Sequence, residues 1–459
     1  MTTHFIGIGG IGMSALARLL LARGECVRGS DTKESALLEQ LRDEGADVYV
    51  GHAPENLDAA DRVVFSSAID QTSNAEYLEA RRRGIPSLHR GELLAQLIGS
   101  AHGIAISGTH GKTTTTAMVH AVLRSGGIDA TLALGGIDRA LGSNAHAGRD
   151  AWFVTEADES DGSFVLIEPK VAVVTNIEND HLASDDELPR LVDAFASFVA
   201  RVPEDGLAVI GADDARASSL LEREHRAPTV TFGLREGAGV RAGNVRAHGL
   251  GTTFDAIAGG VCLGGVELGV PGTMNVRNAL VAVAVGRGLG LPFAHIADGL
   301  RAFQGVQRRF DVLCRSGRMI VVDDYAHHPT AIRETIATAR AYHRGPLVVA
   351  FQPHRFTRTA YLARDFAQAL SGADRVYLAP VYAASEPPLP GVSSASIGEP
   401  LAALGADVTC VARVEELETR LSSDAPPGSL VLMLGAGDIT EVAARLARRV
   451  RPQTARSIA

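Results

Sequence analysis

Short apolar runs alternate with amphipathic stretches in the first part of the chain. Strands are expected over short, mainly apolar segments, and helices where apolar residues recur three or four positions apart. By these criteria the strands lie at 3–9, 25–29, 47–50 and 62–66, and the helices at 12–23, 34–44 and 91–99. This βαβ rhythm predicts a parallel sheet with helices on its faces.

Two further series of elements follow, and we place their boundaries near residues 101 and 312. In the middle series we expect strands at 103, 151–155, 171–175 and 206–210, helices at 188–202, 275–289 and 293–303, and β-hairpins over 227–272. In the last series we expect strands at 319–323, 347–351, 375–379, 407–411 and 429–434, with helices between them. The pattern predicts three α/β domains.

Composition narrows the class of protein. The 459 residues suit about three domains, and the 49 glycines suit many tight turns. The net charge is -9 without a long block of like charge, so nucleic acid is not expected as a partner. Four cysteines without metal-type spacing suggest free thiols in a reducing cytosol. We expect neither a signal peptide nor a membrane span, because no apolar run reaches about 18 residues.

A glycine-rich turn after the strand at 103 predicts a phosphate site. The run from Ile106 to Thr116 reads ISGTHGKTTTT, so the turn leads into a helix with Lys112 and Thr113 at its start. Backbone N–H groups at such a turn surround phosphate, Lys112 can reach the β- and γ-phosphates, and Thr113 can ligate Mg²⁺. The candidate ATP-binding residues are Gly108, Thr109, His110, Gly111, Lys112, Thr113 and Thr114. A ligand-free glycine-rich turn is the bland alternative.

A second glycine motif opens the chain. Gly7, Gly9 and Gly12 follow the first strand in a GxGxxG pattern, and Asp31 ends the second strand, as a ribose-binding acid does in dinucleotide folds. Alone, this motif indicates an NAD-binding domain. A nucleotide-sugar diphosphate carries the same pyrophosphate, and tight helix–strand packing would also explain the glycines. The candidate substrate-binding residues here are Gly9, Gly10, Ile11, Gly12 and Asp31.

Acidic residues follow two neighbouring strands of the middle series. Glu156, Asp158, Glu159 and Asp161 come after the strand at 151–155. Carboxylates gathered at a strand end call for cations, and Mg²⁺ prefers oxygen ligands, so Glu156 is the first metal candidate. The alternative is a solvated acidic loop. His181 follows the next strand and is a candidate second-metal or phosphate ligand, although a lone histidine is more often structural.

Two motifs of the last series combine aromatic, imidazole and guanidinium side chains. The strings DDYAHHPT and FQPHRFTRT each follow an apolar strand and enter a helix. Open α/β sheets bind ligands at this carboxyl edge, and the arginines suit a carboxylate or phosphate. Helix capping explains some of these residues but not both histidines and both arginines. The candidates are Asp324, Tyr325, His328, His354, Arg355 and Arg358.

Together these motifs resemble the Mur ligase family, ATP-dependent amide-forming enzymes of peptidoglycan precursor synthesis. The resemblance rests on HFIGIGGIGMSALA, SGTHGKTTTT, EADESDGSF, NIENDH, DDYAHHP, FQPHRFTRT and VYAASEPPLPG, which run from residue 4 to about 391. It implies an N-terminal Rossmann-like domain binding a UDP-sugar (1–101), a central P-loop ATPase-like domain with a small β-rich part (102–311), and a C-terminal Rossmann-like domain (312–459).

Within the family, the first of these strings favours the member that joins L-alanine to UDP-N-acetylmuramate. For that member we expect a cytoplasmic location and a monomer or weak homodimer. The resemblance implies binding of ATP and of two Mg²⁺ ions, with Thr113, Glu156 and His181 as metal ligands. It assigns Asn275, Asn278, Arg309 and Asp324 to the nucleotide. Catalytic roles fall to Lys112, Glu156, His181, His328, His354 and Arg355, and substrate contacts to Tyr325, His328, His354, Arg355 and Arg358.

One departure from the family pattern concerns the adenine segment. Thr273 and Met274 stand where the family usually has Arg-His, although Met274 can pack against a purine. Three alternatives also stay open at this point: a sister ligase that recycles murein tripeptide, an NAD-dependent oxidoreductase, and a binding protein that uses ATP as a switch. The choice between the two ligases rests on the glycine loop alone.

Overall fold

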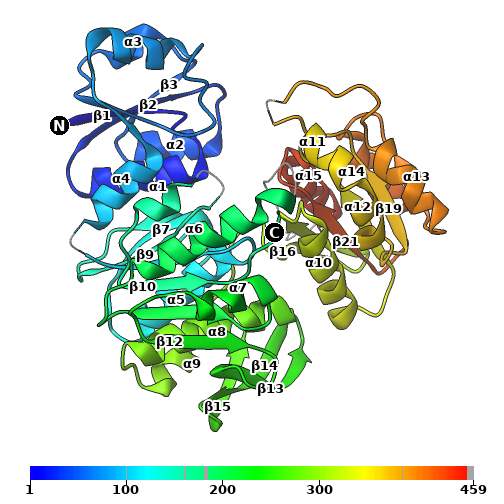
Figure 1. The fold of residues 1–459 in the computed structure, drawn as a ribbon. Helices are drawn as coiled ribbons and strands as arrows, with labels where there is room; N and C mark the ends of the chain where they lie inside the picture. Colours follow the sequence, from blue (N-terminus) through cyan, green and yellow to red (C-terminus); the bar gives the residue numbers. More distant parts are fainter. Residues whose placement is uncertain (100, 160–161, 180–184, 385, 452–459) are drawn as a thin grey trace, which may run out of the picture. The chain divides into compact units, whose positions relative to one another are not determined.

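The computed structural model describes residues 1–99, 101–159, 162–179, 185–384 and 386–451 (Figure 1). They form three sheets, mostly parallel, with helices on their faces, which confirms the predicted α/β class and three-part architecture. The chain divides into two compact units. The first holds residues 1–245, 254–268 and 275–304, and the second holds 246–253, 269–274 and 305–459. The predicted domain limits at 101 and 312 stay a proposal.

The N-terminal sheet has the strand order β3-β2-β1-β4-β5, and all its pairs are parallel. Its strands are β1 (Thr2–Ile6), β2 (Cys26–Asp31), β3 (Asp47–Val50), β4 (Arg62–Phe65) and β5 (Ser87–His89). The order reverses at β1, so the glycine loop that follows β1 lies at the switch point, where doubly wound sheets bind ligands.

Helices cover both faces of this sheet (Figure 1). They are α1 (Ile11–Ala22), α2 (Ala36–Asp43), α3 (Ala75–Arg83) and α4 (Arg90–Ile98), with the 3₁₀ turn η1 (Pro54–Leu57). Apolar residues of α1, α2 and α4 pack on one face and those of α3 on the other. The helix α4 begins with a reciprocal capping box between His89 and Glu92, which the sequence prediction of a helix at 91–99 did not identify.

The central sheet has ten strands in the order β15-β14-β13-β12-β11-β10-β6-β9-β7-β8. They are β6 (His102–Ser107), β7 (Thr131–Asp138), β8 (Ser143–His146), β9 (Trp152–Glu156), β10 (Val171–Val174), β11 (Leu207–Gly211), β12 (Thr229–Gly233), β13 (Val240–His248), β14 (Gly251–Ala258) and β15 (Val261–Leu268). The strand β6 lies between β9 and β10, parallel to both. The segments that follow these three strands therefore meet at one edge.

The helices and 3₁₀ turns of the central part are α5 (Lys112–Ser125), η2 (Ser163–Leu166), η3 (Asp185–Glu187), α6 (Leu188–Ala200), α7 (Ala215–Ser219), η4 (Leu220–Glu222), α8 (Thr273–Gly288) and α9 (Phe293–Ala302). Phe195 and Phe198 of α6 bury fully against Phe164. The helix α5 packs against α9 and against β6, β7 and β9. The start of α5 is thereby held rigidly above the sheet edge.

The predicted hairpin region is partly right. Strands β13, β14 and β15 are neighbours in the sheet and are joined by two-residue connections at 249–250 and 259–260. The strand β12 differs, because it pairs in parallel with β11 and β13 and continues the main sheet. The hairpin of β7 and β8 was not predicted, since its residues include glycines and lack a clear alternation.

The C-terminal sheet has the order β16-β17-β21-β18-β19-β20, with β16 antiparallel and the others parallel. Its strands are β16 (Asp311–Arg315), β17 (Met319–Asp324), β18 (Leu347–Phe351), β19 (Arg375–Leu378), β20 (Val408–Cys410) and β21 (Ser429–Leu434). The strand β16 was not predicted, because it is short and has only two strongly apolar residues. The last strand, β21, is inserted between β17 and β18.

Two helical layers enclose this sheet. The helices α10 (Pro329–Tyr342), α12 (Ala363–Leu370) and α13 (Ala395–Ala403) pack on one face, and α14 (Glu416–Asp424) and α15 (Ile439–Val450) on the other; α11 (Phe356–Tyr361) follows β18. Both faces of β21 are buried, which explains its unbroken apolar sequence. Among the helices of the described residues, none has the length and apolar character needed to cross a membrane.

Candidate active site

The predicted phosphate loop joins β6 to α5, and its backbone is shaped by two glycines. Gly108 has φ +124° and Gly111 has φ +88°, a region that side chains with Cβ rarely adopt. A Cβ on Gly108 would also lie 2.1 Å from Oγ1 of Thr175. Both the dihedral angle and the close approach therefore require glycine, and the loop reaches the N-terminus of α5 as a phosphate-binding turn does.

The end of β10 holds this loop through backbone and side-chain hydrogen bonds. The N–H of His110 donates to Oδ1 of Asn176 at 2.9 Å, and Nδ2 of Asn176 donates back to the carbonyl of His110 at 3.1 Å. The Thr109 N–H donates to the Asn176 carbonyl at 3.0 Å. Thr109 also exchanges hydrogen bonds with the backbone of Glu178. The loop is therefore fixed before any ligand arrives.

Lys112 points back over the loop to a carboxylate. Its Nζ donates to the carbonyl of Gly108 at 2.7 Å and to both oxygens of the buried Glu159 at 2.9 and 2.8 Å. Burial by itself lowers the pKa of Lys112, but the nearby carboxylates of Glu159 and Asp158 outweigh it and the net shift is upward. The ammonium group therefore stays charged, as a phosphate-binding lysine must.

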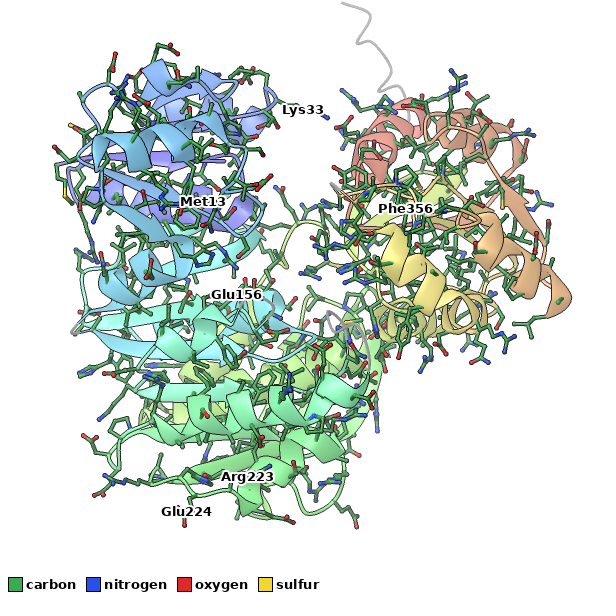
Figure 2. All side chains as sticks on the ribbon, turned by 45° about the horizontal axis from the view of Figure 1, so that its top comes forward. Met13, Lys33, Glu156, Arg223, Glu224 and Phe356 are labelled. Carbon is green, nitrogen blue, oxygen red and sulfur yellow. The ribbon has the colours of Figure 1, made fainter. Side chains whose placement is uncertain are left out.

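Two of the predicted magnesium ligands lie side by side. Glu156, labelled in Figure 2, ends β9, and its Oε2 accepts a hydrogen bond from the Thr113 hydroxyl at 3.0 Å. Its Oε1 accepts from the N–H of Gly135 in β7. A hydroxyl and a carboxylate at the start of α5 are hard oxygen donors, so this pair fits Mg²⁺. The third predicted ligand, His181, lies outside the described residues.

The predicted adenine segment reaches the same loop. Asn275 and Asn278 are buried in the first turns of α8, and Nδ2 of Asn278 donates to Oδ1 of Asn275 at 3.2 Å. A Cβ on Gly111 would lie 2.6 Å from Oδ1 of Asn278. The structure thus brings Asn278 directly against the phosphate loop.

The N-terminal glycine loop is held by Asp31, the residue that ends β2. The N–H of Gly9 donates to Oδ2 of Asp31 at 2.9 Å, and the Thr32 N–H donates to Oδ1 at 2.7 Å. Gly7 has φ +82°, and a Cβ on Gly9 would lie 2.8 Å from Asp31. One oxygen of Asp31 is therefore occupied by the loop itself, which weakens the comparison with a ribose-binding acid of an NAD-binding domain.

Polar contacts connect the glycine loop to the central sheet. The guanidinium of Arg90, at the start of α4, lies beside Gly12 and donates to Oδ2 of Asp158 at 2.7 Å. On α1, the guanidinium of Arg18 contacts Oδ1 of Asn144 in β8 and also binds Glu44 at 2.8 Å. Asn144 in turn donates to the carbonyl of Ile11 at 2.6 Å. The first unit thus holds both predicted phosphate-binding loops in one framework.

In the second unit, the acids that end β17 shape the turn after it. The carboxylate of Asp324 accepts the N–H groups of Phe310 at 2.6 Å and of Ala326 at 2.7 Å. Burial raises the pKa of Asp324, and it raises the pKa of Asp323 to about 6. Asp323 accepts a hydrogen bond from the Thr440 hydroxyl group at 2.6 Å. Asp324 is therefore engaged by the backbone in this structure.

Aromatic rings and cations line the edge of the C-terminal sheet. The guanidinium carbon of Arg309 lies 5.0 Å from the centre of the Tyr325 ring. Tyr325 contacts His327, and His327 contacts His354, with ring centres 5.0 and 5.6 Å apart. Arg355 is exposed at the start of α11, one residue before Phe356, which Figure 2 labels. The buried predicted residues of this edge are Asp324, His328 and Arg358.

The structure therefore gathers the predicted residues into two groups. Those of the phosphate loop, the metal pair, the adenine segment and the N-terminal glycine loop belong to the first unit, and those from Arg309 to Arg358 belong to the second. The sequence prediction gave no role to Glu159, Asn176, Arg90 and Gly135. The first two stand in strings that the family resemblance quoted, whereas Gly135 and Arg90 carry no local signal.

The fold and site define a P-loop protein of three α/β parts, with a phosphate loop, a hydroxyl–carboxylate pair suited to magnesium, and a further glycine loop at a sheet switch point. Three family models match successive parts: the Mur ligase family catalytic domain at 2–102, the Mur ligase middle domain at 106–286, and the Mur ligase glutamate ligase domain at 308–437. The chain belongs to the Mur ligase family.

Similar proteins cover nearly the full length. UDP-N-acetylmuramate–L-alanine ligase of Trichlorobacter lovleyi is 45% identical over 97% of this chain and 98% of its own. That of Geobacter sulfurreducens is 44% identical over 95% of each. The crystal structure of UDP-N-acetylmuramate-alanine ligase MurC from Thermotoga maritima has a TM-score of 0.85, with 32% identity over 98% of this chain and 99% of that one. The murein peptide ligase of Psychrobacter arcticus, with a TM-score of 0.74 at 24% identity over 99% and 100% of the two chains, shares the fold.

Proposed function

We propose that this Mur ligase joins L-alanine to UDP-N-acetylmuramate and converts ATP to ADP and phosphate. The observation that carries the proposal is the 45% identity, over almost the whole of both chains, to a protein named for this reaction. The likeness to a murein peptide ligase stands at 24% identity and supports the fold alone. We propose that the enzyme acts in the cytoplasm at an early step of peptidoglycan synthesis, and that it is a monomer or weak homodimer.

The first unit supplies the nucleotide site in this proposal. The loop from Gly108 to Thr114 surrounds the phosphates of ATP and offers N–H groups at the N-terminus of α5, while Lys112 leaves Glu159 to contact the γ-phosphate. Thr113 and Glu156 hold Mg²⁺, and His181 holds a second ion. When bound, Mg²⁺ neutralises charge on the transferring phosphoryl group. Asn275 and Asn278 hold the adenine end, and the family resemblance also assigns Arg309 and Asp324 to the nucleotide.

The glycine loop supplies the sugar-nucleotide site. The loop of Gly9, Gly10, Ile11 and Gly12 lies at the switch point of the sheet and leads into the N-terminus of α1, where a pyrophosphate can approach because no Cβ intervenes at the glycines. Asp31 keeps the loop in this shape through its hydrogen bond to Gly9. This role accounts for the motif without NAD.

The reaction has two steps. A carboxylate oxygen of the muramoyl group attacks the γ-phosphorus, the bond between that phosphorus and the β–γ bridging oxygen breaks, and ADP leaves. The neutral amine of alanine then attacks the carbonyl carbon of the acyl phosphate, a C–N bond forms, and phosphate leaves with the former carboxylate oxygen.

The residues proposed around these groups have separate roles. Lys112 stabilises negative charge that develops in the first step. Arg355 orients the carboxylate of the incoming alanine, Arg358 and Tyr325 orient the muramoyl carboxylate, and His328 and His354 accept the proton that the alanine nitrogen must lose.

The experiment measures phosphate release with ATP, Mg²⁺ and UDP-N-acetylmuramate, with L-alanine, glycine, L-serine or murein tripeptide in separate reactions. Release that requires both the sugar nucleotide and L-alanine supports the proposal. Phosphate release that occurs with murein tripeptide but with none of the single amino acids would show the recycling reaction instead. Release that needs no acceptor would indicate an ATP switch, and binding of NAD would revive the oxidoreductase.

A further inference from the structure

The backbone of Arg355 has an unusual conformation. Arg355 precedes α11 with φ +70° and ψ 139°, a combination that residues other than glycine avoid because Cβ clashes with the backbone. Such a conformation persists only where the surrounding structure enforces it. The residue is also exposed and belongs to the group that we propose for substrate carboxylates. The residues in contact with Arg355 must therefore enforce its conformation.

The segment after β19 enforces this conformation through the backbone. The N–H of Arg355 donates to the carbonyl of Tyr382 at 2.8 Å, and the N–H of Tyr382 donates to the carbonyl of Pro353 at 2.8 Å. These two bonds form an isolated parallel bridge between His354 and Tyr382. The backbone N–H of Arg355 is thus hydrogen-bonded to the segment that follows β19, and β19 lies next to β18 in the sheet.

The side chain of Tyr382 reinforces the bridge. Its ring stacks on His354, with centres 5.7 Å apart and planes 13° from parallel. On its other side the ring lies against Gly437, where an added Cβ would meet ring carbons at 2.6 and 2.7 Å. Tyr382 is therefore held between the end of β18 and the turn that follows β21, and glycine at 437 leaves the space for it.

Further contacts close a circle around the sheet edge. The turn that holds Gly437 accepts hydrogen bonds from Arg308, at 2.8 Å to the carbonyl of Gly435 and at 3.4 Å to that of Gly437. The guanidinium carbon of Arg308 lies 4.9 Å from the centre of the Tyr325 ring, which leads through His327 to His354. Tyr382 completes this circle.

Glu386 fixes the other end of the same segment. Its carboxylate accepts the N–H of Thr357 at 3.1 Å and the Thr357 hydroxyl at 2.7 Å. The same segment therefore holds the chain on both sides of Arg355. The bridge at Tyr382 holds the residues that lead up to Arg355, and the carboxylate of Glu386 holds the residues that follow it. A rotation of the Arg355 backbone would have to break the bridge.

We propose that Tyr382 is a positioning residue for the amino-acid half of the reaction, because it holds Arg355 in the conformation that aims its guanidinium at the carboxylate of the incoming amino acid. The inference rests on the proposed function. It predicts a selective effect: losing the ring releases Arg355 and weakens use of L-alanine, while the sites for ATP and the sugar nucleotide in the first unit keep their geometry.

The test compares steady-state kinetics for all three substrates in the wild type, Tyr382→Ala and Tyr382→Phe. We expect Tyr382→Ala to raise KM for L-alanine about tenfold, since small misplacements of a binding group have effects of this order. KM for ATP and for UDP-N-acetylmuramate should stay within about twofold, as the first unit is untouched. Tyr382→Phe keeps the ring and should restore the wild-type KM. Tyr361→Ala removes an equally large, exposed ring from α11 and serves as the control.

Gly437→Ala provides a second route if Tyr382→Ala does not fold, because its methyl would meet two carbons of the same ring at 2.6 and 2.7 Å, together with Oε1 of Gln352 at 2.5 Å. Equal changes in all three KM values, or a Tyr382→Phe protein that behaves like Tyr382→Ala, would overturn the proposal. A crystal structure of Tyr382→Ala separates this failure from failure of the proposed function. Arg355 with negative φ supports the positioning role even if the wild type proves independent of alanine, and an unchanged φ of +70° refutes it.

Discussion

Gly135 offers a sharp test of the metal site, because it lies against the proposed ligand Glu156 but is not itself a proposed ligand. Its N–H donates to Oε1 of Glu156, and an added Cβ would meet the two carboxylate oxygens at 2.8 and 3.0 Å. A methyl group there must push the carboxylate away by about 0.5 Å, and misplacements of up to 1 Å cost up to about 10²-fold in rate. We therefore expect Gly135→Ala to lower kcat about tenfold to a hundredfold.

The same displacement should raise the Mg²⁺ concentration needed for half-maximal rate, because Glu156 would no longer lie beside Thr113. The assay is phosphate release as a function of Mg²⁺, together with calorimetric titration of the ATP analogue with and without the ion. Gly265→Ala is the control, since a Cβ there meets nothing within 4 Å. A Gly135→Ala enzyme with wild-type rate and Mg²⁺ dependence would refute this placement of the metal.

Three further predictions test the nucleotide site and the framework. Replacing Lys112 with alanine should lower kcat about 10²- to 10⁴-fold, and a near-normal rate would exclude its role. Asn144→Ala removes the buried hydrogen bonds of Asn144 to Nη1 of Arg18 and to Oγ of Ser14, so urea unfolding should show a loss of about 1–3 kcal/mol, and no loss would contradict the network. Burial lowers the pKa of His120 to about 4, against about 6.5 when unfolded, so stability present above pH 6.5 is lost as pH falls. Wild type should lose about 2 kcal/mol more than His120→Gln between pH 7 and 5, and equal losses would refute this.

The sequence predicts the elements best where apolar runs are long and buried. Strand β21 is buried on both faces and was predicted at its observed limits. The strands β7, β8 and β16 were missed because they are short, polar or rich in glycine, so sheet pairing determines them more than local preference does. The parallel pairing of β12 with β11 likewise depends on contacts between distant segments.

The site shows the same division. The motif around Lys112 predicts a phosphate loop from spacing alone, and the structure has glycine where positive φ requires it. The partners of that loop follow from sheet order, which brings the ends of β9 and β10 to either side of β6. Sequence spacing does not reveal that Gly135 contacts Glu156, or that Tyr382 and Gly437 hold Arg355, because these residues meet only through the folded sheet edges.

Transfer of an oxygen atom tests the central claim most directly. UDP-N-acetylmuramate labelled with ¹⁸O in its carboxylate is incubated with ATP, Mg²⁺ and L-alanine, and the released phosphate is analysed by mass spectrometry. An acyl phosphate requires that each phosphate released carries one oxygen from the sugar carboxylate, with one alanine joined per ADP formed. Phosphate without the label, released without a new amide bond, would contradict the proposed ligase reaction.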